Sequence, residues 1–253
     1  MNQSWSTCVS GKLTKKSFSS KDKRVLKKNQ ILLAINYAGP IQVTSREGYT
    51  GMVNIVVEPF HLDMVYPLRE KSSHSQLTAV KDSNAPSYRV AVVKFDNTAK
   101  YMSGEFAAFY EKNDIIQEFS PPYSPQQNGK VERVNRVTVV MGRSMVIGAN
   151  FPTAYWAEAF VCAAYVRNRC PTKVFDGKTP MGAFPGKEHD ISNLHVFGCK
   201  ELVPKKHHTK LGSKTCNGIF IGYAADGAYL VYIPRRGTGD IVTTRMKRER
   251  KLP

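Results

Sequence analysis

Apolar residues in the first two thirds of the chain recur with the periods of both strands and helices. Short apolar or β-branched runs predict five strands, at residues 31–36, 52–58, 63–68, 89–95 and 115–119. Apolar positions spaced three and four apart predict four helices, at residues 72–82, 104–112, 131–147 and 154–169. This succession predicts an α/β fold in which helices flank a mixed sheet.

The pattern changes after residue 172. Glycine and proline interrupt the next segment, and beyond it short alternating runs are separated by Gly-rich turns, which predicts a small C-terminal all-β barrel. The expected domains are a basic flexible arm at 1–29, the α/β core at 30–172, a linker at 173–190, the barrel at 191–245 and a basic tail at 246–253.

The boundary between loop and helix is best defined in residues 120–136. Three prolines and the turn signal Asn128-Gly129 predict an ordered loop that reaches Lys130, with a helix beginning directly after it. The buried stripe of that helix is expected at Val131, Val134, Thr138, Met141 and Met145. Its opposite face is expected to carry Glu132, Arg136 and Arg143.

Two acidic residues are candidates for a site. Asp96 follows the predicted strand at 89–95, and the carboxyl ends of buried strands are where α/β sheets place their ligands. Thirty-five residues separate Asp96 from Glu132. Taken alone, Glu132 is better explained as a solvated side chain that pairs with Arg136 one turn away.

The spacing of Asp96 and Glu132 and the surrounding motifs resemble integrases of copia-type long-terminal-repeat retrotransposons. The matching segments are FSPPYSPQQNGKVERVNR at 119–136, RNRCPT at 167–172 and VFGCK at 196–200, within a resemblance that covers roughly residues 8–244. The resemblance implies a ribonuclease H-like core followed by a Src-homology-3-like barrel. It also implies an acidic triad that holds Mg²⁺ or Mn²⁺ for DNA strand transfer. Asp96 and Glu132 are then the catalytic and metal-binding residues.

The first acid of that triad is missing. Where the family has a pattern like H-T-D-V-C-G-P-I, this chain has AINYAGPI, so that Asn36 stands at the acidic position. An amide brings no charge to a cation, so weakened or absent metal binding and impaired catalysis are expected. Glu58 and Asp63 are poor substitutes because they belong to neighbouring strands at other heights.

No zinc is expected. The family's zinc domain ends in a pattern like C-x-x-C, and here only Cys8 matches it. Cys199, His207, His208 and Cys216 lack paired ligand spacing.

The five cysteines contain no C-x-x-C pair, and the sequence has neither a leader nor a run of eighteen apolar residues. A reducing nuclear or cytoplasmic location is therefore expected, with no secretion and no membrane partner.

The charge of the chain indicates a polyanionic partner. There are 37 Lys and Arg against 20 Asp and Glu, which gives a net charge of +17. DNA, contacted mostly through its phosphate backbone, is the expected partner. The candidate contact residues are Tyr123, Gln126, Gln127, Asn128, Lys130, Arg133, Arg136 and Arg143. A solvated charged face is the alternative.

Three functions remain open on these grounds. The first is a DNA-binding integrase core whose catalysis is impaired, the second is an active two-metal DNA strand transferase or endonuclease, and the third is a non-catalytic basic nucleic-acid-binding module. The resemblance further implies a homodimer or a larger multimer.

Overall fold

The computed structural model describes residues 26–72, 80, 88–95, 104–119, 125–184, 191–205, 209–235 and 239–245. Most of the predicted basic arm, the basic tail and almost all of the helix candidate at 72–82 lie outside these residues. No helix in the described ranges has the length and apolar character needed to cross a membrane.

A five-stranded mixed sheet forms the core, which confirms the predicted strands. Its strands are β1 (Gln30–Ala38), β2 (Gly51–Glu58), β3 (Leu62–Leu68), β4 (Arg89–Phe95) and β5 (Ile116–Phe119). Their spatial order is β3-β2-β1-β4-β5. The first three strands pair antiparallel, while β4 runs parallel to both β1 and β5. The carboxyl ends of β1, β4 and β5 therefore meet at one edge of the sheet.

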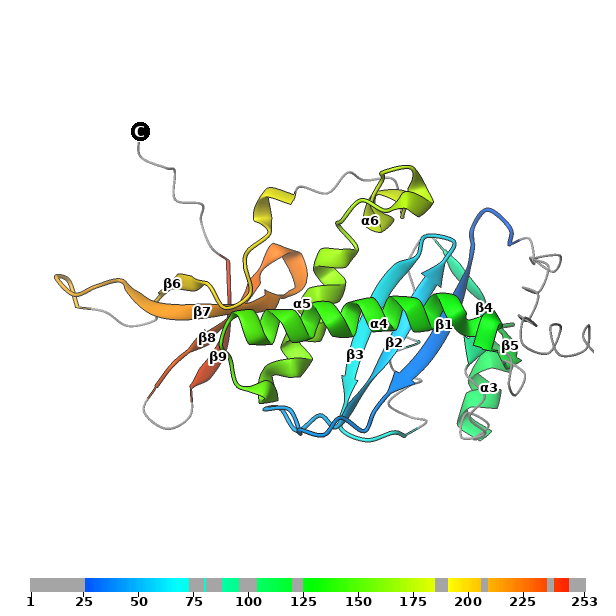
Figure 1. Ribbon diagram of the computed structural model, residues 1–253, viewed down its shortest axis with the longest axis horizontal. Coiled ribbons are helices and arrows are strands. Elements are labelled where there is room, and N and C mark those ends of the chain that lie inside the picture. Colours follow the sequence, from blue (N-terminus) through cyan, green and yellow to red (C-terminus); the bar gives the residue numbers. More distant parts are fainter. Residues whose placement is uncertain are drawn as a thin grey trace, which may run out of the picture.

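Helices cover both faces of this sheet, and the period of two along β1 divides its residues between them. Leu33 and Ile35 pack with Tyr110 of α3 (Gly104–Lys112) on one face. Ala34 packs with Val131 of α4 (Pro125–Gly148) on the other. Figure 1 shows α4 lying across β1, β2 and β3, and α5 (Trp156–Arg167) follows on the same side.

The start of α4 differs from the prediction. The helix begins at Pro125, so the ordered loop predicted for residues 125–130 is wrong, and Asn128-Gly129 belongs to the helix instead of a turn. The earlier part of that predicted loop, residues 120–124, lies outside the described residues. Proline is tolerated in the first turn because its missing N–H has no helical partner there. Val131, Val134 and Thr138 of the predicted stripe are buried, whereas Met141 and Met145 are only half-buried.

The close packing of α4 on α5 depends on a small residue. A Cβ atom on Gly142 would lie 2.2 Å from Cδ1 of Phe160, so only glycine permits this approach of the two helices. Trp156, Phe160 and Ala164, which are spaced four residues apart along α5, are buried.

The C-terminal strands form an open sheet and not the predicted barrel. They are β6 (Lys200–Pro204), β7 (Thr215–Tyr223), β8 (Tyr229–Ile233) and β9 (Asp240–Thr244), paired antiparallel in the order β6-β7-β8-β9. Among the described residues no pairing of β6 with β9 closes the sheet. Its apolar face is covered by helices, since Phe220 and Val231 share a cluster with Val146 of α4 and with Ala159 and Cys162 of α5.

Short helical elements connect the larger ones. They are η2 (Thr153–Tyr155), η3 (Lys173–Phe175), α6 (Pro180–Ala183), η4 (Ile191–Asn193) and η5 (Ala225–Gly227). In α6, the Thr179 side chain accepts a hydrogen bond from the Gly182 N–H and caps the first turn.

Candidate active site

Asn36 lies near the carboxyl end of β1, beside the end of β4. The last described pair between these strands is Ile35 with Phe95, so Asn36 and Asp96 are the next residues along each chain. The Asn36 side chain is half-buried and alternates with Ile35, so it belongs to the face that α4 covers. Asp96 itself lies outside the described residues.

Glu132 belongs to the part of α4 that crosses β1 and β2. Its neighbours Val131 and Val134 are buried in a cluster with Ala34 and Val56, which fixes this segment of the helix on the sheet. The Glu132 side chain is exposed. Glu132 and Asn36 thus belong to elements that pack together on one face of the sheet, whereas their convergence with Asp96 stays a prediction.

The predicted DNA-contacting residues fall into two groups. Tyr123 lies outside the described residues, and the side chains of Gln126, Gln127, Asn128 and Lys130 are not described, although their backbone is helical. Arg133, Arg136 and Arg143 are exposed on α4, as expected. Apolar side chains accompany these arginines, since Val137, Val140 and Ile147 are exposed too.

A second amide, which no motif in the sequence marks, lies opposite Asn36. Asn54 of β2 is its cross-strand partner and is fully buried. Within the described part of the chain, neither polar atom of the Asn54 side chain has a hydrogen-bond partner. A buried unsatisfied polar group costs about 1–3 kcal/mol, so the interior beside Asn36 is polar at a cost to stability.

The described residues fit a two-metal site poorly. Hard divalent cations prefer charged carboxylates, and such a site gains most of its affinity from them. β1 offers the neutral amide of Asn36, and its neighbour on β2 is the neutral amide of Asn54. In the described part of α4, Glu132 is the only carboxylate, and its side chain is exposed.

Asp63, one of the two possible substitute ligands in the sequence, is engaged in buried contacts with α4 and α5 and is not available to a metal ion. Its buried carboxylate accepts a hydrogen bond from the Thr138 hydroxyl of α4 and lies 4.0 Å from the Arg167 guanidinium of α5. Its backbone exchanges hydrogen bonds with the Asn168 side chain, at 2.8 and 2.6 Å. Asp63 therefore joins β3 to both helices.

Burial has the largest effect on this carboxylate and raises the pKa of Asp63. The Thr138 hydrogen bond, the Arg167 charge and the Asn54 side chain act in the opposite direction, although the Asn54 amide does not reach hydrogen-bonding geometry. The other possible substitute, Glu58, pairs with His61 at 3.3 Å.

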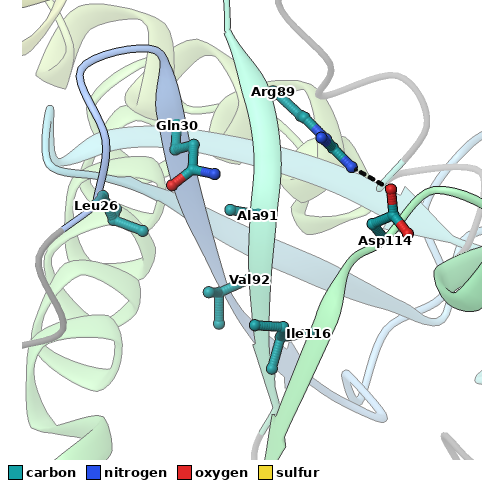
Figure 2. Close-up of a pocket in the computed structure, with 7 residues that line it drawn as sticks. All are labelled: Leu26, Gln30, Arg89, Ala91, Val92, Asp114 and Ile116. Atoms are coloured by element: carbon teal, nitrogen blue, oxygen red, sulfur yellow. Dashed lines mark hydrogen bonds and ion pairs between the residues drawn. The ribbon is translucent and has the colours of Figure 1, made fainter.

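A separate hollow lies at the far end of the strands, as Figure 2 shows. Gln30 and Arg89, the first residues of β1 and β4, line it together with Leu26 and Ile116. Arg89 forms an ion pair of 2.7 Å with Asp114 at its rim. Because Asn36 lies near the opposite end of β1, this hollow is not part of the candidate active site.

Comparisons with known proteins identify the fold and the family. No protein-family model matches the chain. A cryo-EM structure of the simian T-cell lymphotropic virus intasome, in complex with PP2A regulatory subunit B56 gamma, contains a chain that superposes with a TM-score of 0.51. The two share 17% identity over 86% of this chain and 77% of that one. The fold is therefore the ribonuclease H-like fold of a retroviral integrase core.

The relatives in sequence are retrovirus-related Pol polyproteins. The polyprotein of transposon TNT 1-94 from Nicotiana tabacum is 31% identical over 85% of this chain. That of transposon RE1 from Arabidopsis thaliana is 30% identical over 90% of it. The chain spans 17% and 16% of their lengths. It belongs to the integrase segment of copia-type retrotransposon Pol polyproteins.

Proposed function

We propose that this chain is an integrase core that binds DNA for DNA integration and that its strand transfer is impaired. The proposal depends on one observation: Asn36 occupies the β1 position beside the carboxyl end of β4, on the face that α4 covers. In this proposal Asp96 and Glu132 are the two remaining acids of the site, and Asn36 stands where the family has the third.

The absence of one charge accounts for the impairment. A divalent metal, when bound, supplies the charge stabilisation and the activated nucleophile for phosphoryl transfer. Asp96 and Glu132 would hold it through carboxylate oxygens, while Asn36 would offer an amide oxygen without charge. Since a bound metal lowers the barrier by several kcal/mol, weaker metal binding is expected to reduce the rate of strand transfer by orders of magnitude.

DNA binding in this proposal is carried by charge. The chain has a net charge of +17, and Arg133, Arg136 and Arg143 are exposed on the helix that bears Glu132. Such side chains contact phosphate oxygens and do not read the sequence of the bases. Amides of the first turns of α4, Gln126 to Asn128, and Tyr123 before them complete the proposed contact surface.

Assembly and location follow the family and belong to the same proposal. The chain is proposed to form a homodimer or a larger multimer in a reducing compartment, nuclear or cytoplasmic. Among the described cysteines, Cys162, Cys170, Cys199 and Cys216 are all free thiols, which supports a reducing environment.

The test is a strand-transfer assay with Mn²⁺ on the purified chain and on Asn36→Asp. We expect the variant alone to be active, because the acid restores the missing charge. Asn36→Ala is the matched control for removal of the amide. The double variant Asn36→Asp/Glu132→Gln should lose the restored activity. If the original chain were as active in strand transfer as an active Asn36→Asp variant, Asn36 would be tolerated at this position.

One observation favours a second candidate, the non-catalytic nucleic-acid-binding module. The neutral amides of Asn36 and Asn54 lie opposite each other on β1 and β2, which supports a site without catalytic chemistry. In that case Asn36→Asp stays inactive. Glu132→Gln then leaves DNA affinity, stability and metal binding unchanged.

A further inference from the structure

Three metal-ligating side chains meet at the start of the C-terminal sheet. The ligand atoms of His195, Cys199 and Glu201 all lie within 4.8 Å of one another. Nδ1 of His195 is 2.7 Å from Oε1 of Glu201, and the Cys199 thiol donates a hydrogen bond of 3.3 Å to the same oxygen. None of these residues belongs to the candidate active site on the five-stranded sheet.

These three residues are not the set of zinc ligands that was considered, and disfavoured, from the sequence. The earlier set combined Cys199 with Cys216, His207 and His208. The two histidines lie outside the described residues. The Cys216 thiol instead faces the Val203 carbonyl at 3.6 Å. Cys199 meets a histidine four residues earlier and a glutamate two residues later, and a turn is needed to bring them together.

The backbone around Cys199 is held firmly by β7. The Gly198 N–H donates to the Phe220 carbonyl at 2.8 Å, and the Phe220 N–H donates to the Cys199 carbonyl at 2.9 Å. Gly198 has a φ of 85°, a conformation that favours glycine and makes the turn possible. The cysteine is therefore positioned by the sheet before any ligand arrives.

The other two side chains are equally well placed. The His195 N–H donates to the Tyr223 hydroxyl at 2.9 Å, and its imidazole packs against the rings of Phe220 and Tyr229. Glu201 belongs to β6, where it pairs with Gly218 of β7. The side chains of His195 and Glu201 are 29% and 13% exposed, so the group is shielded but reachable from solvent.

The arrangement does not suit a cysteine nucleophile. A nucleophilic thiol is usually activated by a neighbouring imidazole, but the Cys199 thiol donates to the weakly basic carboxylate of Glu201, and the imidazole contacts that same carboxylate. Burial, with the Glu201 carboxylate as a further cause, raises the pKa of the Cys199 thiol to about 12. The sulfur is thus protonated unless a cation replaces the proton.

We propose that His195, Cys199 and Glu201 bind one Zn²⁺ ion, with the fourth position of the tetrahedron open to water. An imidazole nitrogen, a thiolate and a carboxylate are the ligand types that Zn²⁺ takes in proteins. Zinc binding displaces the thiol proton to solvent as the Zn–S bond forms, with no oxidation or reduction.

The geometry requires only small movements. Zinc bonds of about 2.0–2.3 Å place tetrahedral ligand atoms about 3.3–3.8 Å apart. The separation of 2.7 Å between Nδ1 and Oε1 must open slightly, while that of 3.3 Å between Sγ and Oε1 already fits. The ion would join the loop before β6 to the strand itself, so zinc is expected to raise the melting temperature of the chain.

The test uses Co²⁺ as a spectroscopic probe of the intact, metal-free chain under a thiol-free reductant. We expect a sulfur-to-cobalt charge-transfer band that saturates at one equivalent and is removed by Zn²⁺. Cys199→Ser should abolish the band, whereas Cys216→Ser, at a partly buried cysteine of the same sheet, should keep it. Cobalt bound by Asp96 and Glu132 gives no such band, so this outcome is independent of the proposed integrase function.

Two further variants keep the thiol and remove one other ligand. His195→Gln and Glu201→Gln should each weaken Co²⁺ binding at least about tenfold, with circular dichroism confirming that the fold is retained. Absence of a sulfur band in the original chain would overturn the zinc site. A band that survives in Cys199→Ser, or affinities unchanged in both glutamine variants, would also overturn it.

Discussion

Among single residues, the most unusual feature is the set of polar side chains beneath α4. Asn36 and Asn54 are neutral amides opposite each other on β1 and β2. Asp63, on the same face of β3, is charged in water but buried here among Thr138, Arg167 and Asn168. The interior beneath this helix therefore contains polar groups beside the apolar cluster of Ala34, Val56, Val131 and Val134, and its properties depend on which of these polar groups carries charge.

The pH dependence of stability is expected to change in Asp63→Asn. The pKa of Asp63 is raised above its ordinary value of 3.8, so the folded chain keeps a proton that the unfolded chain releases. The stability contributed by the protonated carboxyl is fully present below about pH 3.8. It falls away as the pH rises through the folded-state pKa. Relative to the variant, the original chain should become less stable across the pH range that begins at about pH 3.8 and ends above the folded-state pKa.

Urea denaturation of both proteins across that pH range measures the difference. The asparagine can still accept the Thr138 hydrogen bond, which makes it a close match in shape. If the difference in the free energy of unfolding stayed constant, or shifted in favour of the original chain as the pH rises, Asp63 would instead be a stabilised carboxylate paired with Arg167.

Among the secondary-structure elements, the turn before β6 joins the C-terminal sheet to the end of α4. A Cβ on Gly198 would lie 2.3 Å from the Cβ of Ala149, just past the end of α4. The buried Phe197 belongs to the same cluster as Val146 of α4. This turn therefore fixes where the C-terminal sheet packs against the helix, and it depends on a residue without a side chain.

Gly198→Ala should destabilise the chain more than Gly177→Ala does. Both glycines have a positive φ, 85° and 87°, so both substitutions cost about 1–2 kcal/mol for the backbone alone. Nothing lies within 4 Å of a Cβ on Gly177, whereas Gly198 meets Ala149 and adds about 1–3 kcal/mol of overpacking. Thermal denaturation compares the two, and equal destabilisation would show that the turn moves freely away from α4.

The sequence predicted the elements better than their ends or their long-range contacts. The strand at β1 and the buried positions Val131 and Val134 follow from local periodicity, which is why both were correct. The start of α4 was wrong because proline signals both a loop and a first helical turn. The barrel was wrong because local alternation predicts strands but does not tell whether their apolar face is covered by other strands or by helices such as α5.

The candidate site was predictable only in part, for a similar reason. Asn36 stood out because a motif surrounds it. Its buried partner Asn54 and the contact of Asp63 with Thr138 are set by sheet register and by helix packing between residues 75 positions apart. No local signal marks such pairs, so the polar interior under α4 was not foreseen.

At the scale of the whole molecule, charge is the dominant property. A net charge of +17 attracts polyanions over the whole surface, but α4 adds exposed arginines beside the proposed site. Some arginines elsewhere are already neutralised, since Arg89 pairs with Asp114 and Arg235 with Asp240 at 2.7 and 2.9 Å. The two groups of arginines should therefore differ in their contribution to DNA binding.

Replacing Arg133 and Arg136 by alanine should weaken DNA binding and lower its salt dependence. Removing one arginine that binds a phosphate reduces the slope of log K against log salt by about 1, so a change of about 2 is expected for the pair. The control is the double alanine variant of Arg89 and Arg235, whose slope should change less. Fluorescence anisotropy between about 50 and 200 mM salt measures both; an affinity that does not vary with salt would refute the proposal of phosphate binding.

Calorimetric titration with Mn²⁺ shows whether the proposed cation site lacks one acid at Asn36. The original chain should show no pair of bound ions at sub-millimolar affinity, whereas Asn36→Asp should gain binding that Glu132→Gln removes again. Two Mn²⁺ ions bound at sub-millimolar affinity by the original chain would contradict the account.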